Sequence, residues 1–478
     1  MKKLKKRRKI KLFKARLAKR NPIFEQQRNK ISPTSSKNFL AGQYQPGFIP
    51  HPLNLSHLKG QKIFPETKLL RLSSSYDLRK EGRLSPVKDQ GPAGTCWAFA
   101  TYGSLESCLL PDQKFDFSEN NMKNLLSENC PAGYDRGPRD GGNQFMSMAY
   151  LTRWDGPVLE KEDPYDPFDD GPCTQFSPQK HIQNVIFIPD RKDASDNQNI
   201  KQAISKYGAV FSGMYYEDQY YNPDKSSYYF PSYSFSNHAV CLVGWDDNYN
   251  RKNFNIEPPK NGAFIVRNSW GTSWGDDGYF YISYYDTAIG SDNAVYYNAE
   301  SPTKYNVIYQ YDPLGWIASV GYRSTTAWFA NIFTASSNKQ ELLAVGWYVG
   351  GVSATYQVQV YTDPAANNPR NGKIAKNVSG TITSPGYFTR SFSKPVALKA
   401  GQKFSIVVKL TTPGYNFPIP LEMPVDGYTS KAVADKGQSF MSKSGTNWED
   451  ITNSWENSSA CLKAYASSKN SDMLPVEK

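Results

Sequence analysis

A cysteine, a histidine and an asparagine in this chain have the order and spacing of a nucleophilic catalytic set. His238 follows Cys96 by 142 residues, and Asn268 follows the histidine by 30. A thiolate is a strong nucleophile, and a neighbouring imidazole can take the thiol proton. An asparagine oxygen can accept the other imidazole N–H and fix the ring. The pattern therefore predicts acyl transfer through a thioester.

The residues around Cys96 favour an ionised sulfur. Residues 96–101 are largely apolar and of helical character, and a glycine-containing loop precedes them. Cys96 is therefore expected at a helix N-terminus, where the partial positive charge of the helix stabilises an anion. A protonated His238 at hydrogen-bond distance would add a full positive charge. We expect a thiolate–imidazolium pair.

Two more side chains complete the expected site. Gln90 lies six residues before Cys96, across two glycines and a proline that can turn the chain back. Its side-chain amide and the backbone N–H of Cys96 are expected to form an oxyanion hole. Trp270 follows Asn268 closely, and its indole is expected to shield the His–Asn hydrogen bond and to lie among the residues that contact substrate.

The elements that must position these residues form two halves. Helices are expected first and strands second, so a cleft between the halves would hold Cys96 on one wall and His238 on the other. The expected helices are 96–108, 118–129, 142–150 and 199–207, and the expected strands are 210–215, 238–245, 262–268 and 278–284.

Three separated motifs resemble those of papain-like cysteine peptidases. They are Gln90-Gly91 with Cys96-Trp97-Ala98-Phe99, Asn237-His238-Ala239-Val240, and Asn268-Ser269-Trp270-Gly271. The resemblance runs from about Tyr76 to about Tyr285. It implies an α+β, two-lobed fold, protein or peptide substrates, and catalysis by Cys96, His238, Asn268 and Gln90 without a cofactor or metal.

The same resemblance implies further roles. Gly141 and Gly142 would hydrogen-bond an extended substrate backbone, although a plain turn is the alternative. Ala239 would line the pocket for the second residue before the scissile bond. Cys130 and Cys173 would form a disulfide, which indicates an oxidising compartment.

Two positions depart from the family pattern. Ala93 stands where a cysteine is usual, so the disulfide made by that cysteine is absent. Asn237 stands where an aspartate often precedes the histidine, so the family's pH optimum cannot be transferred. Neither change affects the catalytic atoms.

The remaining chain is expected to form an all-β sandwich. Residues 355–361 alternate with period two, and residues 403–410 form a second strand-like run after a turn. Residues 311–316, 327–331 and 410–415 resemble the lectin-like domain that follows some prokaryotic papain-like peptidases. Trp316, Trp328 and Trp347 would either stack on the sugars of a cell-surface glycan or fill the sandwich core, and the core is favoured.

Five regions are therefore expected along the 478 residues. They are a basic N-terminal segment that is disordered or targeting (1–20), a pro-segment or linker cleaved near residues 73–75 (21–75), a papain-like peptidase domain (76–300), a lectin-like β-sandwich domain (305–467) and a disordered tail (468–478).

The net charge of +12 arises entirely from the N-terminal segment. Residues 1–20 hold twelve Lys or Arg, which leaves 44 basic and 44 acidic residues elsewhere. A nucleic-acid-binding body is therefore not supported. No stretch approaches 18 apolar residues, so no transmembrane helix is expected. The segment has the charge of a secretory signal but not its apolar region. An extracellular or cell-surface location is expected, with the cytoplasm as the alternative.

The sequence predicts a cysteine endopeptidase with an accessory β-sandwich for targeting or for substrate or glycan binding. Two alternatives are open. One is a catalytically idle surface adhesin or glycan-binding protein, and the other is a transpeptidase that uses the same site.

Overall fold

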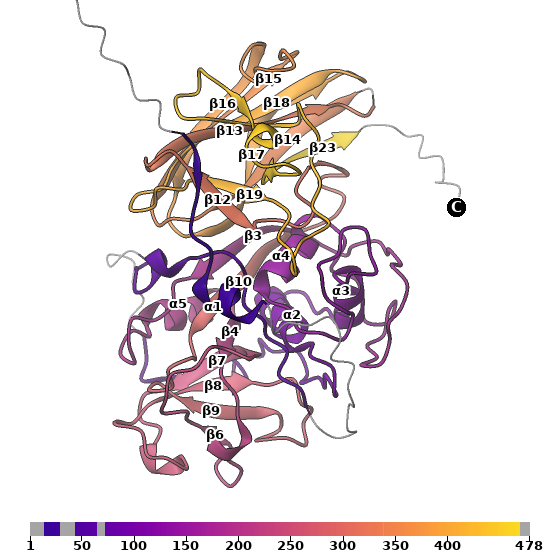
Figure 1. Ribbon diagram of the computed structural model, residues 1–478. Helices are drawn as coiled ribbons and strands as arrows, with labels where there is room; N and C mark the ends of the chain where they lie inside the picture. The colour runs from indigo at the N-terminus through magenta and orange to yellow at the C-terminus, as the bar shows by residue number, and fades with distance from the viewer. Residues whose placement is uncertain (1–13, 29–43, 65–71, 338, 469–478) are drawn as a thin grey trace, which may run out of the picture.

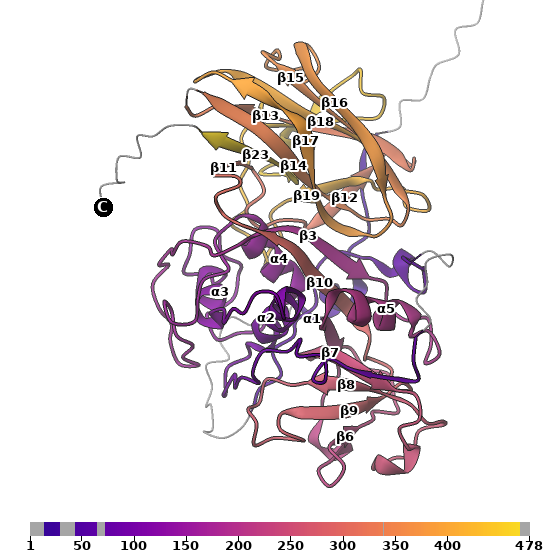
Figure 2. The ribbon, with the colours of Figure 1, turned by 180° about the vertical axis from the view of Figure 1, so that it is seen from behind.

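The computed structural model describes residues 14–28, 44–64, 72–337 and 339–468. Two bodies lie one above the other, a mixed helical and β body below and an all-β body above (Figures 1 and 2). The described helices lie in the lower body and the stretch before it. None of them combines the length and apolarity that a bilayer crossing requires.

The first half of the lower body is built on three helices. They are α2 (Cys96–Leu109), α3 (Glu119–Leu125) and α4 (Gln144–Thr152). The side chains of Ser118 and Asn143 cap the second and third, each accepting a hydrogen bond from backbone N–H groups of the first turn. The first twelve residues of α2 are buried, so this helix forms the centre of the lobe.

The second half is a sheet whose strands pair antiparallel except for β6 with β9, and four of its strands lie where the sequence predicted strands. Its strands are β3 (His181–Ile188), β4 (Val210–Met214), β7 (His238–Asp246), β8 (Ala263–Arg267), β9 (Tyr279–Ser283) and β10 (Ser291–Glu300), with the short β5 (Tyr221–Asn222) and β6 (Ser227–Tyr228) at its edge. Helix α5 (Gln198–Tyr207) precedes β4. Because β4 and β8 flank β7, His238 starts a strand that is fixed on both sides.

The upper body consists of antiparallel strands that continue to the end of the described chain. They are β11 (Val307–Tyr309), β12 (Ala318–Gly321), β13 (Thr326–Thr334), β14 (Gln340–Val349), β15 (Ala354–Thr362), β16 (Lys373–Ile382), β17 (Gly386–Leu398), β18 (Lys403–Thr411), β19 (Ile419–Glu422), β20 (Ser439–Ser442), β21 (Glu449–Asp450), β22 (Ser459–Ala460) and β23 (Leu462–Ser468). Strands β14 and β15 belong to two different sheets. Trp347 on β14 packs against Tyr356 on β15, with ring centroids 5.0 Å apart, so the two sheets share one aromatic core.

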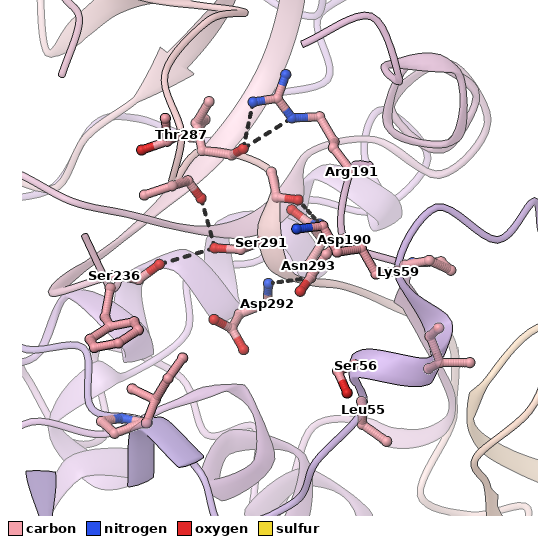
Figure 3. Close-up of a pocket in the computed structure, with 18 of the residues that line it drawn as sticks. Leu55, Ser56, Lys59, Asp190, Arg191, Ser236, Thr287, Ser291, Asp292 and Asn293 are labelled. Carbon is pink, nitrogen blue, oxygen red and sulfur yellow. Dashed lines mark hydrogen bonds between the residues drawn. The ribbon is translucent and has the colours of Figure 1, made fainter. Parts of the chain in front are cut away.

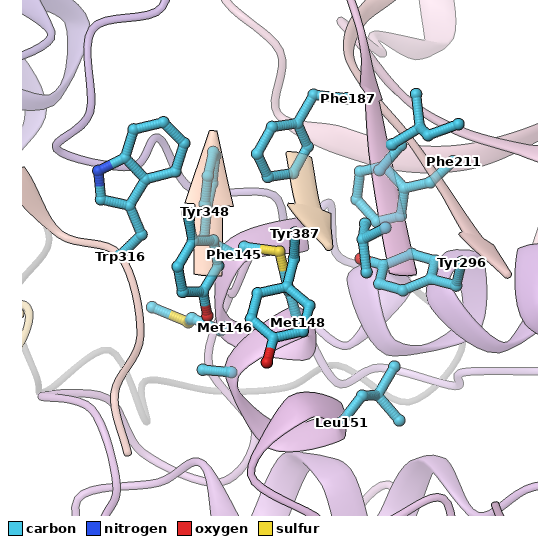
Figure 4. Close-up of a cluster of buried hydrophobic side chains, with 14 of the residues drawn as sticks. Phe145, Met146, Met148, Leu151, Phe187, Phe211, Tyr296, Trp316, Tyr348 and Tyr387 are labelled. Carbon is cyan, nitrogen blue, oxygen red and sulfur yellow. The ribbon is translucent and has the colours of Figure 1, made fainter. Parts of the chain in front are cut away.

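One sheet continues from the upper body into the lower one. Strand β17 pairs with β3, with Gly386 opposite Ile186 and Phe388 opposite Asn184. In the described part of the chain this creates a 13-stranded sheet. Figure 4 shows the apolar side chains at the junction, where Trp316 lies 6.4 Å from Phe145 of α4 between ring centroids. The two bodies are therefore joined by backbone hydrogen bonds and by a common core.

The residues before the lower body pack across both bodies. Strand β1 (Arg16–Leu17) pairs with β12, and helix α1 (Pro22–Gln27) buries Phe24 against Tyr428. A 3₁₀ turn, Ser56–Leu58, and strand β2 (Ser75–Asp77), which pairs with β7, complete this part. The described part of the basic segment, residues 14–20, therefore differs from the expected disordered tag, because β12 offers it a strand edge. Residues 1–13 and 469–478 lie outside the described part.

Candidate active site

Cys96 is the first residue of α2 and is fully buried. The preceding loop turns at Gly91, whose φ of +59° lies in the left-handed region that glycine adopts easily. This turn brings the chain back from Gln90 so that the sulfur stands at the N-terminal end of the helix. The helix dipole there favours a negative charge on sulfur.

His238 begins β7, on the opposite wall from α2. The backbone N–H of Ala239, the next residue, donates a hydrogen bond to Cys96 Sγ at 3.4 Å. The sulfur therefore lies against the start of β7, where the helical lobe meets the sheet, next in sequence to His238. Ala239 itself is buried, and its strand neighbour in β4 is Gly213.

Asn268 directly follows β8 and orients the imidazole. His238 Nε2 lies 2.8 Å from Asn268 Oδ1. Because an amide oxygen only accepts, Nε2 carries the proton, and Nδ1 is left as the basic nitrogen. Nδ1 has no hydrogen-bond partner among the described residues. The indole of Trp270 lies 4.8 Å from the imidazole between ring centroids and shields this hydrogen bond.

Gln90 is also part of the site, but its amide is in use. Its Oε1 accepts a hydrogen bond from Ser269 Oγ at 2.7 Å, which fixes the side chain. Its Nε2 donates to the carbonyl oxygens of Ala93 at 2.8 Å and of Gln45 at 3.0 Å. Gln45 belongs to the segment before the lower body. A carbonyl of that segment therefore occupies a donor that an oxyanion would need.

Residues 44–50 run through the cleft, and sequence analysis did not anticipate this. The Gly142 N–H donates to Gly47 O at 2.9 Å, and Gly142 O accepts from Ile49 N at 3.1 Å. These two hydrogen bonds lie on either side of Phe48. The Phe48 N–H donates to Asn237 O at 2.8 Å. Gly142 thus binds an extended backbone, and the bound chain is the protein's own. The motif Pro46-Gly47-Phe48 is the one signal in the sequence that could have indicated a segment bound in the cleft.

Tyr44 and Gly47 of this segment lie against the walls of the cleft. The Tyr44 ring stacks on Trp270, with centroids 5.0 Å apart and an interplanar angle of 13°. A Cβ on Gly141 would approach Gly47 O to 2.7 Å, so the glycine allows the close passage of the segment. Trp270 and Gly141 therefore both face a chain that lies in the cleft.

Burial determines the charge state of the two reactive groups in this covered form. Desolvation raises the pKa of Cys96 to about 11, although the backbone N–H groups of Ala239 and Gly47 oppose this shift. Desolvation also lowers the pKa of His238 to about 4, although the hydrogen bond that the ring donates to Asn268 opposes this shift. Both shifts favour the neutral form of the group at pH 7. They oppose the expected thiolate–imidazolium pair in the covered form, and that pair stays a prediction for the cleft without residues 44–50.

The disulfide prediction is confirmed. Cys130 and Cys173 are joined by an S–S bond of 2.09 Å across a separation of 43 residues. Cys241 and Cys461 are buried free thiols, and Cys108 is a partly buried one. Among the residues that the structure describes, no group of three or more His, Cys, Asp or Glu side chains is placed to hold a metal ion.

The three tryptophans considered for sugar stacking are all buried. Trp347 is fully enclosed, Trp316 donates its indole N–H to Ala318 O at 2.9 Å, and the guanidinium of Arg370 covers the Trp328 ring at 4.8 Å. The alternative that they fill the core therefore holds for these residues, and none of them offers a free face to a sugar.

Fold and site together define a two-lobed papain family cysteine protease domain followed by a lectin-like domain. Family models agree with this: the papain family cysteine protease model matches residues 72–299, and the lectin like domain model matches residues 308–466. Residues 72–299 therefore belong to the papain family of cysteine proteases by sequence and fold.

Two solved structures share both domains. The cysteine protease and lectin-like domains of Cwp84, a surface layer associated protein of Clostridium difficile, superpose with a TM-score of 0.79 at 26% identity, over 95% of this chain and 98% of that one. Clostridial Cwp84 after propeptide cleavage gives a TM-score of 0.74 at 28% identity, over 83% of this chain and 100% of that one.

Two curated relatives each match about half of the chain. Procathepsin L from Mus musculus is 30% identical over 237 residues, which is 48% of this chain and 65% of the relative. A cathepsin L-like peptidase from Aedes aegypti is 29% identical over 46% of this chain and 63% of its own length. The chain therefore spans less than two thirds of the length of these relatives.

Proposed function

We propose that this protein is a cysteine endopeptidase that is made as an inactive precursor, in which residues 44–50 cover the active site. The observation that carries the proposal is the His238–Asn268 hydrogen bond of 2.8 Å, which leaves the imidazole Nδ1 free on the wall that touches Cys96 Sγ through Ala239. A general base must lie within reach of the proton that it takes, and the contact of the neighbouring Ala239 with the sulfur supports this role for His238.

The proposed reaction has two stages. His238 Nδ1 takes the thiol proton while Cys96 Sγ attacks the peptide carbonyl, and the oxygen that becomes negative is stabilised by Gln90 Nε2 and the Cys96 N–H. The imidazolium then protonates the leaving amine, and the thioester remains. His238 next takes a proton from water, hydroxide attacks the thioester, and the thiol is restored as the acid product leaves.

The covering segment supports a zymogen. Residues 44–50 occupy Gly142, Gln90 and Trp270 at once, which are the groups that a substrate would need. We propose that cleavage near residues 73–75 releases the segment. The hydrogen bond from Asp247 N to Ser74 O and the pairing of β2 with β7 would keep the new N-terminus on the enzyme.

The path of the segment also supports endopeptidase activity. Tyr44 lies against Trp270 at one end and Phe48 lies against Gly142 at the other, so a continuous chain crosses the cleft. A cleft that admits chain on both sides of the sulfur can cut within a polypeptide. The lectin-like domain would act as an accessory unit for targeting or for binding substrate or glycan, and the disulfide supports export to the cell surface.

Hydrolysis of an internally quenched peptide by the cleaved protein, with Cys96→Ala as the matched control, tests this proposal. We expect turnover by the wild type and none by the variant, with unchanged folding by circular dichroism. Adding a free amine tests the transpeptidase alternative. A transpeptidase would give the amine adduct as its main product, whereas an idle adhesin would give neither product.

A further inference from the structure

A cavity of about 720 Å³ lies between the N-terminal segment and the sheet lobe (Figure 3). Phe48 and His51 line it from the segment, and Asp190, Ser236 and Asp292 line it from the peptidase domain. Its volume is within the range of ligand pockets, about 300–1,000 Å³. The cavity is therefore large enough for a long side chain.

Phe48 links the cavity to the cleft. Its two neighbours, Gly47 and Ile49, hydrogen-bond to Gly142, so its backbone lies in an extended strand along the cleft. Its side chain lines the cavity. A substrate that replaces the segment along Gly142 must also project one side chain from this position, because side chains of an extended chain alternate across it.

The peptidase side of the cavity is acidic. Asp292 donates its backbone N–H to Asp190 Oδ1 at 3.0 Å, which places the two aspartates together. Two buried acceptors beside them have no partner among the described residues: Gln144 Oε1 and Asn293 Oδ1, on side chains that are 3% and 2% exposed. Gln144 also donates to Asp292 Oδ1 at 3.3 Å, so its free oxygen lies next to the aspartates.

Basic side chains of the covering segment face this acidic group. His51 Nε2 lies 3.2 Å from Asp292 Oδ1, and the charge of Lys59 acts on Asp190. Arg191 of the peptidase domain also acts on Asp190, but its guanidinium is bound to the carbonyl oxygens of Tyr284, Asp286 and Ile289. When the segment leaves, His51 and Lys59 leave with it, and Asp292 loses its partner in the segment.

We propose that Asp190 and Asp292, with Gln144 and Asn293, form a pocket that selects a lysine or arginine side chain of the substrate. The residue selected is the one that pairs with Gly142, the second before the scissile bond. A guanidinium or ammonium group of the substrate would take the place of His51 beside Asp292 and would donate to the buried acceptor oxygens that lack a partner. This inference rests on the proposed peptidase function.

Two peptides that differ only in arginine or leucine at that position test the pocket. The full chain is folded first and its N-terminal segment is then removed by proteolysis. We expect kcat/KM for the arginine peptide to be at least about tenfold higher, and Asp292→Asn to reduce this ratio by about tenfold. Asp193→Asn, an exposed aspartate at the edge of the same cavity, is the matched control and should keep the ratio. Equal rates for the two peptides would overturn the inference.

Binding separates this inference from the proposed function. The same peptides are titrated calorimetrically into the cleaved Cys96→Ala protein, which binds without turning over. Tighter binding of the arginine peptide supports the pocket even where the wild type hydrolyses neither peptide, a result that would overturn only the proposed function. Equal affinity for the two peptides overturns the pocket whatever the rates are.

Discussion

The side-chain amide of Gln90 donates a hydrogen bond to the backbone carbonyl of Gln45, with 3.0 Å between nitrogen and oxygen. One residue comes from the loop before the nucleophile and the other from a segment that precedes the peptidase domain. The contact joins two features, a group suited to stabilise an oxyanion and a chain that already occupies it. Catalysis and its restraint therefore depend on the same atoms.

Substitution of Gly47 should weaken the binding of residues 44–50 in the active-site cleft. A Cβ at this position would meet Gly94 O at 1.9 Å, so Gly47→Ala cannot keep the present path. We expect the uncleaved variant to hydrolyse a fluorogenic peptide at a rate well above that of the uncleaved wild type. Gly82→Ala strains the backbone at a φ of +65° but its Cβ meets nothing within 4 Å, so it is the control for a loss of stability away from the cleft. A folded Gly47→Ala protein as inactive as the uncleaved wild type would contradict the zymogen proposal.

Asn268→Ala should slow the cleaved enzyme without unfolding it. The variant loses the acceptor that holds Nε2, so the ring can rotate and Nδ1 is no longer aimed at the sulfur. A misplaced general base costs roughly 100-fold or more in kcat. The measurement is kcat alongside a melting curve, with exposed Asn248→Ala as the control. A normal rate would mean that another group orients His238.

Gln90→Ala should lower kcat more than it raises KM. The amide would act on the oxyanion and not on the ground-state carbonyl, and removing one such donor costs roughly 100- to 1000-fold in rate. Steady-state kinetics of the cleaved variant separate the two constants. If KM alone changed, Gln90 would be a binding residue and the oxyanion assignment would be wrong.

Lys463→Met should destabilise the lectin-like domain. Lys463 Nζ lies 3.0 Å from Asp312 Oδ2, and the two side chains are 1% and 0% exposed. Removing the cation leaves a buried carboxylate unpaired, which costs about 3–5 kcal/mol. Burial already raises the pKa of Asp312, so the loss should shrink at acid pH, where the carboxyl is neutral.

Thermal unfolding across pH measures this effect. The double variant Asp312→Asn, Lys463→Met should recover part of the loss, because no charge is then buried alone. Lys436→Met, at an exposed position, is the control and should melt like the wild type. Equal melting temperatures for Lys463→Met and the wild type would show that the pair adds nothing to stability.

The sequence predicted the elements that carry the site because local pattern and motif coincide there. Cys96 starts a helix expected over 96–108 and found over 96–109, and His238 starts a strand expected over 238–245 and found over 238–246. The Cys130–Cys173 disulfide was likewise predicted. These features depend on short-range periodicity, or on a family motif that is visible in the chain itself.

Long-range contacts were not predictable in the same way. The stretch 44–50 has no periodicity that distinguishes an inhibitory strand from a linker, and its partner Gly142 lies about a hundred residues away. The pairing of β17 with β3 joins positions some 200 residues apart in sequence. The raised pKa of Cys96 follows from its burial in the folded protein and not from the residues beside it in the sequence.

The pH dependence of Cys96 alkylation by iodoacetamide tests the central claim most directly. In the uncleaved protein burial raises the pKa of Cys96 to about 11, so reaction at pH 7 should be slow and should rise only in alkali. After cleavage we predict fast alkylation at neutral pH and below, which is lost in His238→Ala. A cleaved protein that reacts like an ordinary thiol, with or without His238, would contradict the catalytic pair.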